Sequence, residues 1–113
     1  MIYLASPYSS QDQDVRFSRF QQVREFAAEF LMRKVHIFSP IVYAHEMAEV
    51  HDLPTDALTW SSFNISMLRR ADALWLLQLD GWVDSLGVQH ELALAQACKI
   101  PVHYYLPNGT EVL

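Results

Sequence analysis

The sequence predicts an α/β protein, a three-layer sandwich in which helices cover both faces of a parallel sheet of four to five strands. Three observations lead to this fold class. Short apolar runs alternate with longer segments of helical periodicity along the chain. The apolar runs are nearly continuous, as is typical of strands buried on both faces. Right-handed crossovers between parallel strands place the intervening helices against the sheet. With 113 residues, we expect one domain over residues 1–113.

The first half of the chain predicts two strands and one long helix. The run "MIYLA" is ended by the turn-forming cluster "SPYSS" and reads as a buried strand. An amphipathic helix is predicted over residues 13–33, because apolar residues recur there at spacings of three and four. That stripe consists of Phe17, Phe20, Val23, Ala27 and Phe30. The run "VHIFSPIV" predicts a second strand that stops at Pro40. Residues 44–58 are mixed and contain Pro54, so we expect a loop with short helical turns.

The second half continues the alternation of strands and helices. Trp60, Phe63, Met67 and Ala71 carry a helical period, which predicts a helix from about Thr59 to Ala71. The run "ALWLLQL" predicts a strand, "DGWVDS" a loop, and residues 86–99 a helix. "PVHYYL" predicts a last strand before the "PNG" turn, with room for one more short element.

This order places three loops at one edge of the sheet. The carboxyl ends of parallel strands share an edge, and small ligands bind beyond it. The loops at that edge are residues 6–10, 39–45 and 80–87. We therefore look for function there.

Composition and charge exclude several classes of protein. The net charge is −5 and the eight basic residues are scattered, which argues against a nucleic-acid or anionic-membrane surface. The single cysteine, Cys98, forms no disulfide framework within one chain. No apolar run approaches the roughly 20 residues of a membrane helix, and "MIYLASPYSS" lacks the basic region of a signal peptide. We expect a cytoplasmic protein.

Glu91 is the most unusual acid in the sequence. On a helical wheel its neighbours are apolar or small, namely Val88, Leu94, Ala95 and Cys98. A carboxylate on an apolar flank is costly unless something solvates it. It either reaches water or pairs with an arginine at the edge of the stripe, or it is stored there for chemistry. Composition alone favours the first alternative, since acids at such edges are common.

Residues around Glu91 supply further candidates. Ser85 is placed to cap the helix, and Gly87 would let a ligand approach the backbone at a helix N-terminus that favours an anion such as phosphate. Trp82 either packs in the loop or stacks on a base. In "HEMAEVH" the histidines are six residues apart, whereas the zinc-protease motif needs four, so we predict no metal site.

Five segments that span nearly the whole chain carry a family resemblance: "IYLASPYS", "FSPIVYAH", "FNISMLRRADALWLL", "LDGWVDSLGVQHELALA" and "IPVHYYL". Together they resemble the nucleoside 2-deoxyribosyltransferase-like superfamily, and within it the small proteins grouped as DUF1937. The resemblance implies a flavodoxin-like fold. It also implies cleavage of the N-glycosidic bond of deoxynucleosides or their monophosphates, with no metal or organic cofactor.

The resemblance also assigns expected roles. Glu91 matches the nucleophile that attacks the anomeric carbon, and Tyr3 matches an aromatic that orients it. Ser85 matches a residue near the sugar or its 5′ substituent. Ser6 and Tyr8 fall in a loop that contacts sugar or phosphate. With these matches, a functional role for Glu91 becomes the better interpretation.

One position departs from the family pattern. Asn64 stands where characterised relatives keep an aspartate that assists departure of the base. An amide can hydrogen-bond a base but cannot deliver a proton as a carboxylic acid can. We therefore carry three hypotheses: an N-glycosidase or deoxyribosyltransferase, a module that binds a nucleotide-like ligand without cleaving it, and a structural protein with a vestigial pocket. The expected partner is a nucleoside or nucleoside monophosphate, and the resemblance implies a homo-oligomer.

Overall fold

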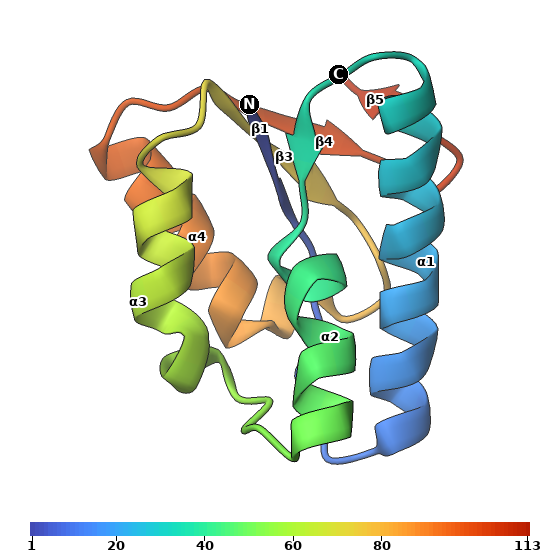
Figure 1. The fold of residues 1–113 in the computed structure, drawn as a ribbon. Coiled ribbons are helices and arrows are strands. Elements are labelled where there is room, and N and C mark those ends of the chain that lie inside the picture. Colours follow the sequence, from blue (N-terminus) through green and yellow to red (C-terminus); the bar gives the residue numbers. More distant parts are fainter.

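The computed structural model describes residues 1–113, apart from the side chain of Ala57, and these residues form one five-stranded sheet with α-helices on both of its faces (Figure 1). The strand order is β2-β1-β3-β4-β5. The strands are β1 (Ile2–Ala5), β2 (Ile37–Phe38), β3 (Ala73–Leu77), β4 (Val102–Tyr105) and β5 (Glu111–Val112). The helices are α1 (Gln13–Met32), α2 (Pro40–His51), α3 (Ala57–Leu68) and α4 (Leu86–Ala97), with a short 3₁₀ turn, η1 (Trp82–Asp84), before α4.

The predicted α/β class is confirmed, but the order of elements gains the helix α2 between β2 and α3, and the sheet is mixed rather than parallel. β1 pairs in parallel with β2 and β3, and β3 pairs in parallel with β4. β5 returns beside β4 in the antiparallel direction, with Tyr104 opposite Val112. The "PNG" turn explains this, because a tight turn can join only antiparallel neighbours.

The prediction of a loop with short helical turns over residues 44–58 was wrong for its first half, because α2 occupies Pro40–His51, whereas residues 52–56 do form a loop. Ser39 caps this helix: its Oγ accepts a hydrogen bond from the backbone N–H of Val42 at 3.1 Å. Pro40 follows at the first helical position, where its missing N–H costs nothing. The serine–proline pair that we interpreted as the end of a strand is therefore also the start of a helix. Two further boundaries differ, since β2 is only two residues long and α3 begins at Ala57 behind the cap of Asp56.

Alternation along β1 divides the core between the two faces of the sheet. Leu4 points to the face covered by α1, where it packs with Val23 and Phe30. Tyr3 and Ala5 point to the opposite face, covered by α3 and α4. Successive strand residues point to opposite faces. The same period that buries Leu4 under α1 therefore aims the Tyr3 side chain at α4.

In Figure 1 the carboxyl ends of β1 and β3 point downward to the middle of the molecule, where α4 begins, and α2 lies below the sheet. No helix in the described part of the chain combines the length and apolar character needed to cross a bilayer.

Candidate functional site

Glu91 lies in the second turn of α4, on the flank that faces the sheet. Ser85 fixes the start of this helix, because its Oγ accepts a hydrogen bond from the N–H of Val88 at 3.3 Å. Tyr3 is a fully buried residue of β1, and its side chain points toward α4. Its hydroxyl donates a hydrogen bond to Oε2 of Glu91. Two residues that are 88 positions apart are thus joined at the edge of the sheet. In the described part of the chain, no salt bridge involves Glu91.

Burial controls the ionisation of this pair. Loss of solvation raises the pKa of Glu91 to about 7, although the hydrogen bond from Tyr3 acts in the opposite direction. Burial and the neighbouring Glu91 charge raise the pKa of Tyr3 far above its ordinary value, so the phenol keeps its proton and remains a donor. Near neutral pH, Glu91 is therefore a mixture of carboxylic acid and carboxylate.

A cavity of about 500 Å³ opens beside Glu91. It lies between the loop after β1, the first half of α2, the start of α3 and the start of α4. The predicted site residues that line it are Ser6, Tyr8, Asn64, Ser85, Gly87 and Glu91. Apolar side chains such as Ile41 and Leu58 form other parts of the wall. The volume falls within the range of small-molecule sites.

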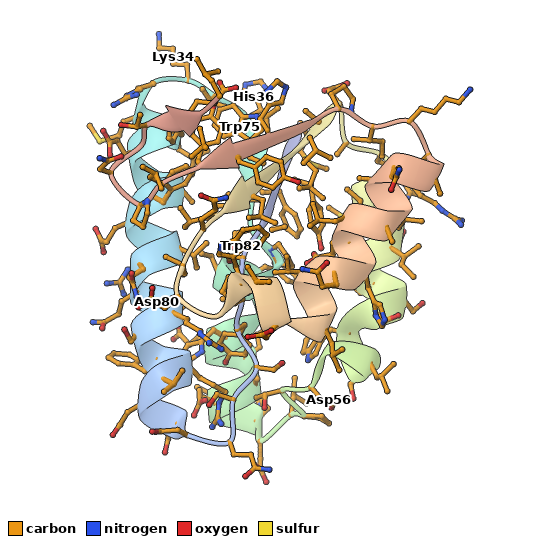
Figure 2. All side chains as sticks on the ribbon, turned by 180° about the vertical axis from the view of Figure 1, so that it is seen from behind. Lys34, His36, Asp56, Trp75, Asp80 and Trp82 are labelled. Atoms are coloured by element: carbon orange, nitrogen blue, oxygen red, sulfur yellow. The ribbon has the colours of Figure 1, made fainter. Side chains whose placement is uncertain are left out.

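Two predicted site residues do not line this cavity. Tyr3 reaches it only through its hydrogen bond to Glu91. Trp82 packs against Tyr104 with ring centroids 6.1 Å apart and joins the core cluster on the α4 side (Figure 2). Trp82 thus packs against Tyr104 and does not line the cavity.

Two polar groups of the cavity residues have no hydrogen-bond partner among the described residues. These are Oγ of Ser6, a residue that is only 6 % exposed, and Oδ1 of Asn64. Buried polar groups are nearly always paired in folded proteins. A ligand carrying N–H or O–H groups would satisfy both.

His45 and Tyr8 form a second polar pair on the cavity wall, which the sequence did not reveal. The Tyr8 hydroxyl lies 2.6 Å from Nδ1 of His45, and the imidazole stacks on Phe20 with centroids 4.1 Å apart. Burial lowers the pKa of His45 and raises that of Tyr8, so both favour their uncharged forms. The signal was present in the spacing of Ile41, His45 and Ala48, which share one face once α2 is recognised as a helix.

Arg19 holds the loops at the cavity edge together. Its Nη1 donates to the carbonyl of Ser9 at 3.0 Å and its Nη2 to the carbonyl of Asp80 at 3.2 Å. Gly81 makes this approach possible: its φ is +89°, and a Cβ there would lie 2.6 Å from the arginine Nη2. The turn after β3 and the loop after β1 are thus fixed relative to one another.

Among the described residues, no group of three or more His, Cys, Asp or Glu side chains is arranged to hold a metal ion. The polar side chains that line the cavity come from serines, histidines, carboxylic acids, Tyr8, Thr55 and Asn64.

Comparison with known proteins identifies the family. No curated protein sequence matches the chain. The family model of DUF1937, described as a domain of unknown function, matches residues 1–106 and so covers almost all of the sequence that forms the sheet and the cavity. The chain belongs to the DUF1937 family.

Proposed function

We propose that this protein is an N-glycosidase or 2-deoxyribosyltransferase that acts on a nucleoside or nucleotide, with Glu91 as the nucleophile. We further propose that its sheet and helices are arranged as in flavodoxin-like proteins, as the resemblance to nucleoside 2-deoxyribosyltransferases implies. The observation that carries the proposal is the contact between the Tyr3 hydroxyl and Oε2 of Glu91 beside a cavity large enough for a nucleoside.

This contact supports nucleophilic catalysis for a physical reason. The carboxylate attacks only when ionised, and an isolated buried carboxylate would keep its proton. The Tyr3 hydrogen bond stabilises the charged form and fixes one oxygen, which leaves the other oxygen of Glu91 for the anomeric carbon. With a pKa of about 7, Glu91 is partly ionised at neutral pH and remains weakly solvated, which suits a nucleophile.

The reaction would follow the two steps of retaining glycoside chemistry. A Glu91 oxygen forms a bond to the anomeric carbon while the bond to the base nitrogen breaks and its electron pair leaves with the base. Water or a second base then attacks the same carbon, which breaks the bond to Glu91 and restores the carboxylate; the proton that the attacking group loses neutralises the departed base. The unpartnered Oδ1 of Asn64 would accept a hydrogen bond from the leaving base.

The test is release of free base from a panel of deoxynucleosides and their monophosphates, followed by chromatography. We expect Glu91→Gln and Glu91→Ala to abolish release, while circular dichroism stays unchanged. Glu25→Gln, which removes an exposed carboxylate on α1, is the matched control and should retain full turnover. Turnover that survives in both Glu91 variants would refute the assignment.

A second candidate function is binding of a nucleotide-like ligand without cleavage. Asn64 favours it, because its amide supplies hydrogen bonds but no acidic proton. A ligand that raises the melting temperature while no base is released would support binding alone. A large gain of activity in Asn64→Asp would instead indicate a glycosidase that lacks its acid.

The open cavity beside Glu91 bears on the hypothesis of a vestigial pocket. A vestigial pocket requires a closed edge near Glu91, and a cavity of about 500 Å³ there weighs against it. We also propose a homo-oligomer, which size-exclusion chromatography with light scattering would test.

A further inference from the structure

The charged residues of the cavity are unevenly distributed. Three acidic residues line it, Asp56, Asp84 and Glu91, whereas no Lys or Arg occurs among its described lining residues. Asp56 lies on the loop ahead of α3 (Figure 2). Two hydrogen bonds, from the N–H and the hydroxyl of Thr59, hold the pKa of Asp56 below its ordinary value, so it is ionised at neutral pH. The cavity is therefore lined by acidic side chains with no lysine or arginine among its described lining residues to balance them.

The nearest arginines are already engaged by the backbone. Nη1 of Arg16 donates to the carbonyl of Ser10 at 2.6 Å, and Nη1 of Arg19 donates to that of Ser9 at 3.0 Å. Both side chains support the loop after β1 from behind, and neither lines the cavity. Nε of Arg16 has no hydrogen-bond partner among the described residues, but because neither arginine lines the cavity, a side chain would have to move to form an ion pair with a phosphate there.

The start of α4 is the one feature that favours an anion, and the chain already places a carboxylate beside it. Asp84 lies immediately before the N-cap Ser85, where a negative charge interacts favourably with the helix dipole. The Oγ of Ser85 also accepts the N–H of Val88, which removes one of the free donors. A phosphate would therefore meet a like charge at the position that best suits it.

Uncharged groups of the cavity also favour a cation. The Trp60 ring lines the wall and is fixed by a hydrogen bond from its Nε1 to the carbonyl of Pro54 at 2.7 Å. An indole face attracts a positive charge. Ser6 is 6 % exposed and its hydroxyl has no partner among the described residues, so it is free to hydrogen-bond a polar group of a ligand.

From these observations we infer that the cavity selects N-glycosides with a cationic base and without a 5′-phosphate, bound in the negative field of Asp56, Asp84 and Glu91. This inference rests on the proposed function in one respect: it takes the ligand to be an N-glycoside. It adds the charge of the base and the absence of the phosphate. N-alkylpurinium and pyridinium nucleosides have the required chemistry.

A cationic base also suits the protonation states of Tyr8 and His45. Tyr8 and His45 are hydrogen-bonded to each other and uncharged, so Tyr8 keeps its proton and His45 has none to supply. A pyridinium base needs no proton to leave. When Glu91 attacks the anomeric carbon, the electron pair of the broken C–N bond neutralises the ring nitrogen. Water then attacks that carbon, so that the net reaction yields neutral base, free sugar and one proton.

The test separates base charge from phosphate with eight ligands: nicotinamide riboside, nicotinamide mononucleotide, inosine, inosine 5′-monophosphate and the 2′-deoxy counterpart of each. Binding is measured by calorimetry at low salt, on the natural chain and on Glu91→Gln. We expect nicotinamide riboside to bind at least about tenfold more tightly than inosine, and a phosphate to weaken either nucleoside about tenfold or more. High salt should reduce both differences.

Two variants locate the source of the selectivity. Asp84→Asn removes an exposed charge, and Asp56→Asn removes a charge while an asparagine still caps α3. Each should lower the preference for the cation and relieve the penalty on phosphate by about threefold or more. Glu25→Gln on α1 removes a charge far from the cavity and should change neither.

The outcomes of binding and of base release are separable. Equal or tighter binding of inosine or of the monophosphates overturns this inference, while release of their bases would leave the proposed glycosidase standing. Tight binding of nicotinamide riboside without release of nicotinamide supports the inference and contradicts the glycosidase. If none of the ligands binds, both are overturned.

Discussion

Glu91→Gln should make the protein more stable, and by an amount that grows with pH. Glutamine keeps an oxygen that accepts the Tyr3 hydroxyl but cannot ionise. In the natural chain, burial raises the pKa of Glu91 from 4.5 in an exposed carboxyl to about 7. Between these values the unfolded chain has lost the proton while the folded chain retains it, so the free energy of unfolding falls as pH rises.

The magnitude follows from the width of that interval. Each unit of pKa difference corresponds to about 1.4 kcal/mol. Glu91 is partly exposed to the cavity, which screens its charge, so we expect the stability advantage of the variant to grow by about 2 to 3 kcal/mol between about pH 4.5 and pH 7.5. Below the lower limit the carboxyl is protonated in both states and the advantage should be constant.

Urea unfolding of both proteins, followed by tryptophan fluorescence across this interval, measures the difference directly. Glu25→Gln serves as the control for the substitution itself. A difference between natural chain and Glu91→Gln that stays constant with pH would refute the reasoning, because it would mean that folding does not perturb this carboxyl. A natural chain that gains stability relative to the variant as pH rises would contradict the sign.

Two further substitutions test the surroundings of the site. Tyr3→Phe removes the hydrogen bond that favours ionised Glu91, so it should lower the free energy of unfolding by about 1 to 3 kcal/mol and move any rise of activity with pH to higher pH, as unfolding curves and a pH–rate profile would show. Gly81→Ala forces a Cβ against Nη2 of Arg19 at a φ of +89° and should cost about 1 to 3 kcal/mol. Gly109 has the same φ, but a Cβ there would contact only the ring of Phe30 at 4.0 Å. Comparing Gly109→Ala with Gly81→Ala therefore separates the cost of backbone strain from the cost of displacing Arg19.

The fold could be predicted to this extent because its strands are buried on both faces. A strand covered by helices on each side must be apolar at every position, so "MIYLA" and "ALWLL" are visible without an alignment. Because every position of such a strand is apolar, the sequence does not show which face of the sheet each side chain points to. Only the period of two, combined with the helices that cover each face, assigns Leu4 to α1 and Tyr3 to α4.

The helix α2 was missed because it covers the end of the sheet and not a face. Its residues are mixed since it contacts the core on a narrow side only, through residues such as Ile41, His45 and Ala48. Pro40 reads equally well as the end of a strand and as a first helical residue, and the cap by Ser39 distinguishes the two only in three dimensions. Missing this helix also concealed the pair of His45 and Tyr8.

Individual side chains of the site were predictable when their spacing fixed their position on α4. Ser85 and Glu91 lie on one helix, so a correct helix places both at the cavity. Trp82 lies in η1, where no period constrains its side chain, and packing against Tyr104 decides its orientation. Sequence spacing therefore locates residues within an element more reliably than those between elements.

The raised pKa of Glu91 links the stability of the protein to its proposed chemistry. The same deprotonation that lowers the free energy of unfolding would create the nucleophile. We therefore expect the pH at which base release reaches half its maximum to coincide, near pH 7, with the pH at which the slope of the stability difference between the natural chain and Glu91→Gln falls to half. Tyr3→Phe should move both midpoints together to higher pH. If the midpoints move independently, the group that controls catalysis is not the carboxyl whose ionisation the fold opposes, and the assignment of Glu91 as the nucleophile would be wrong.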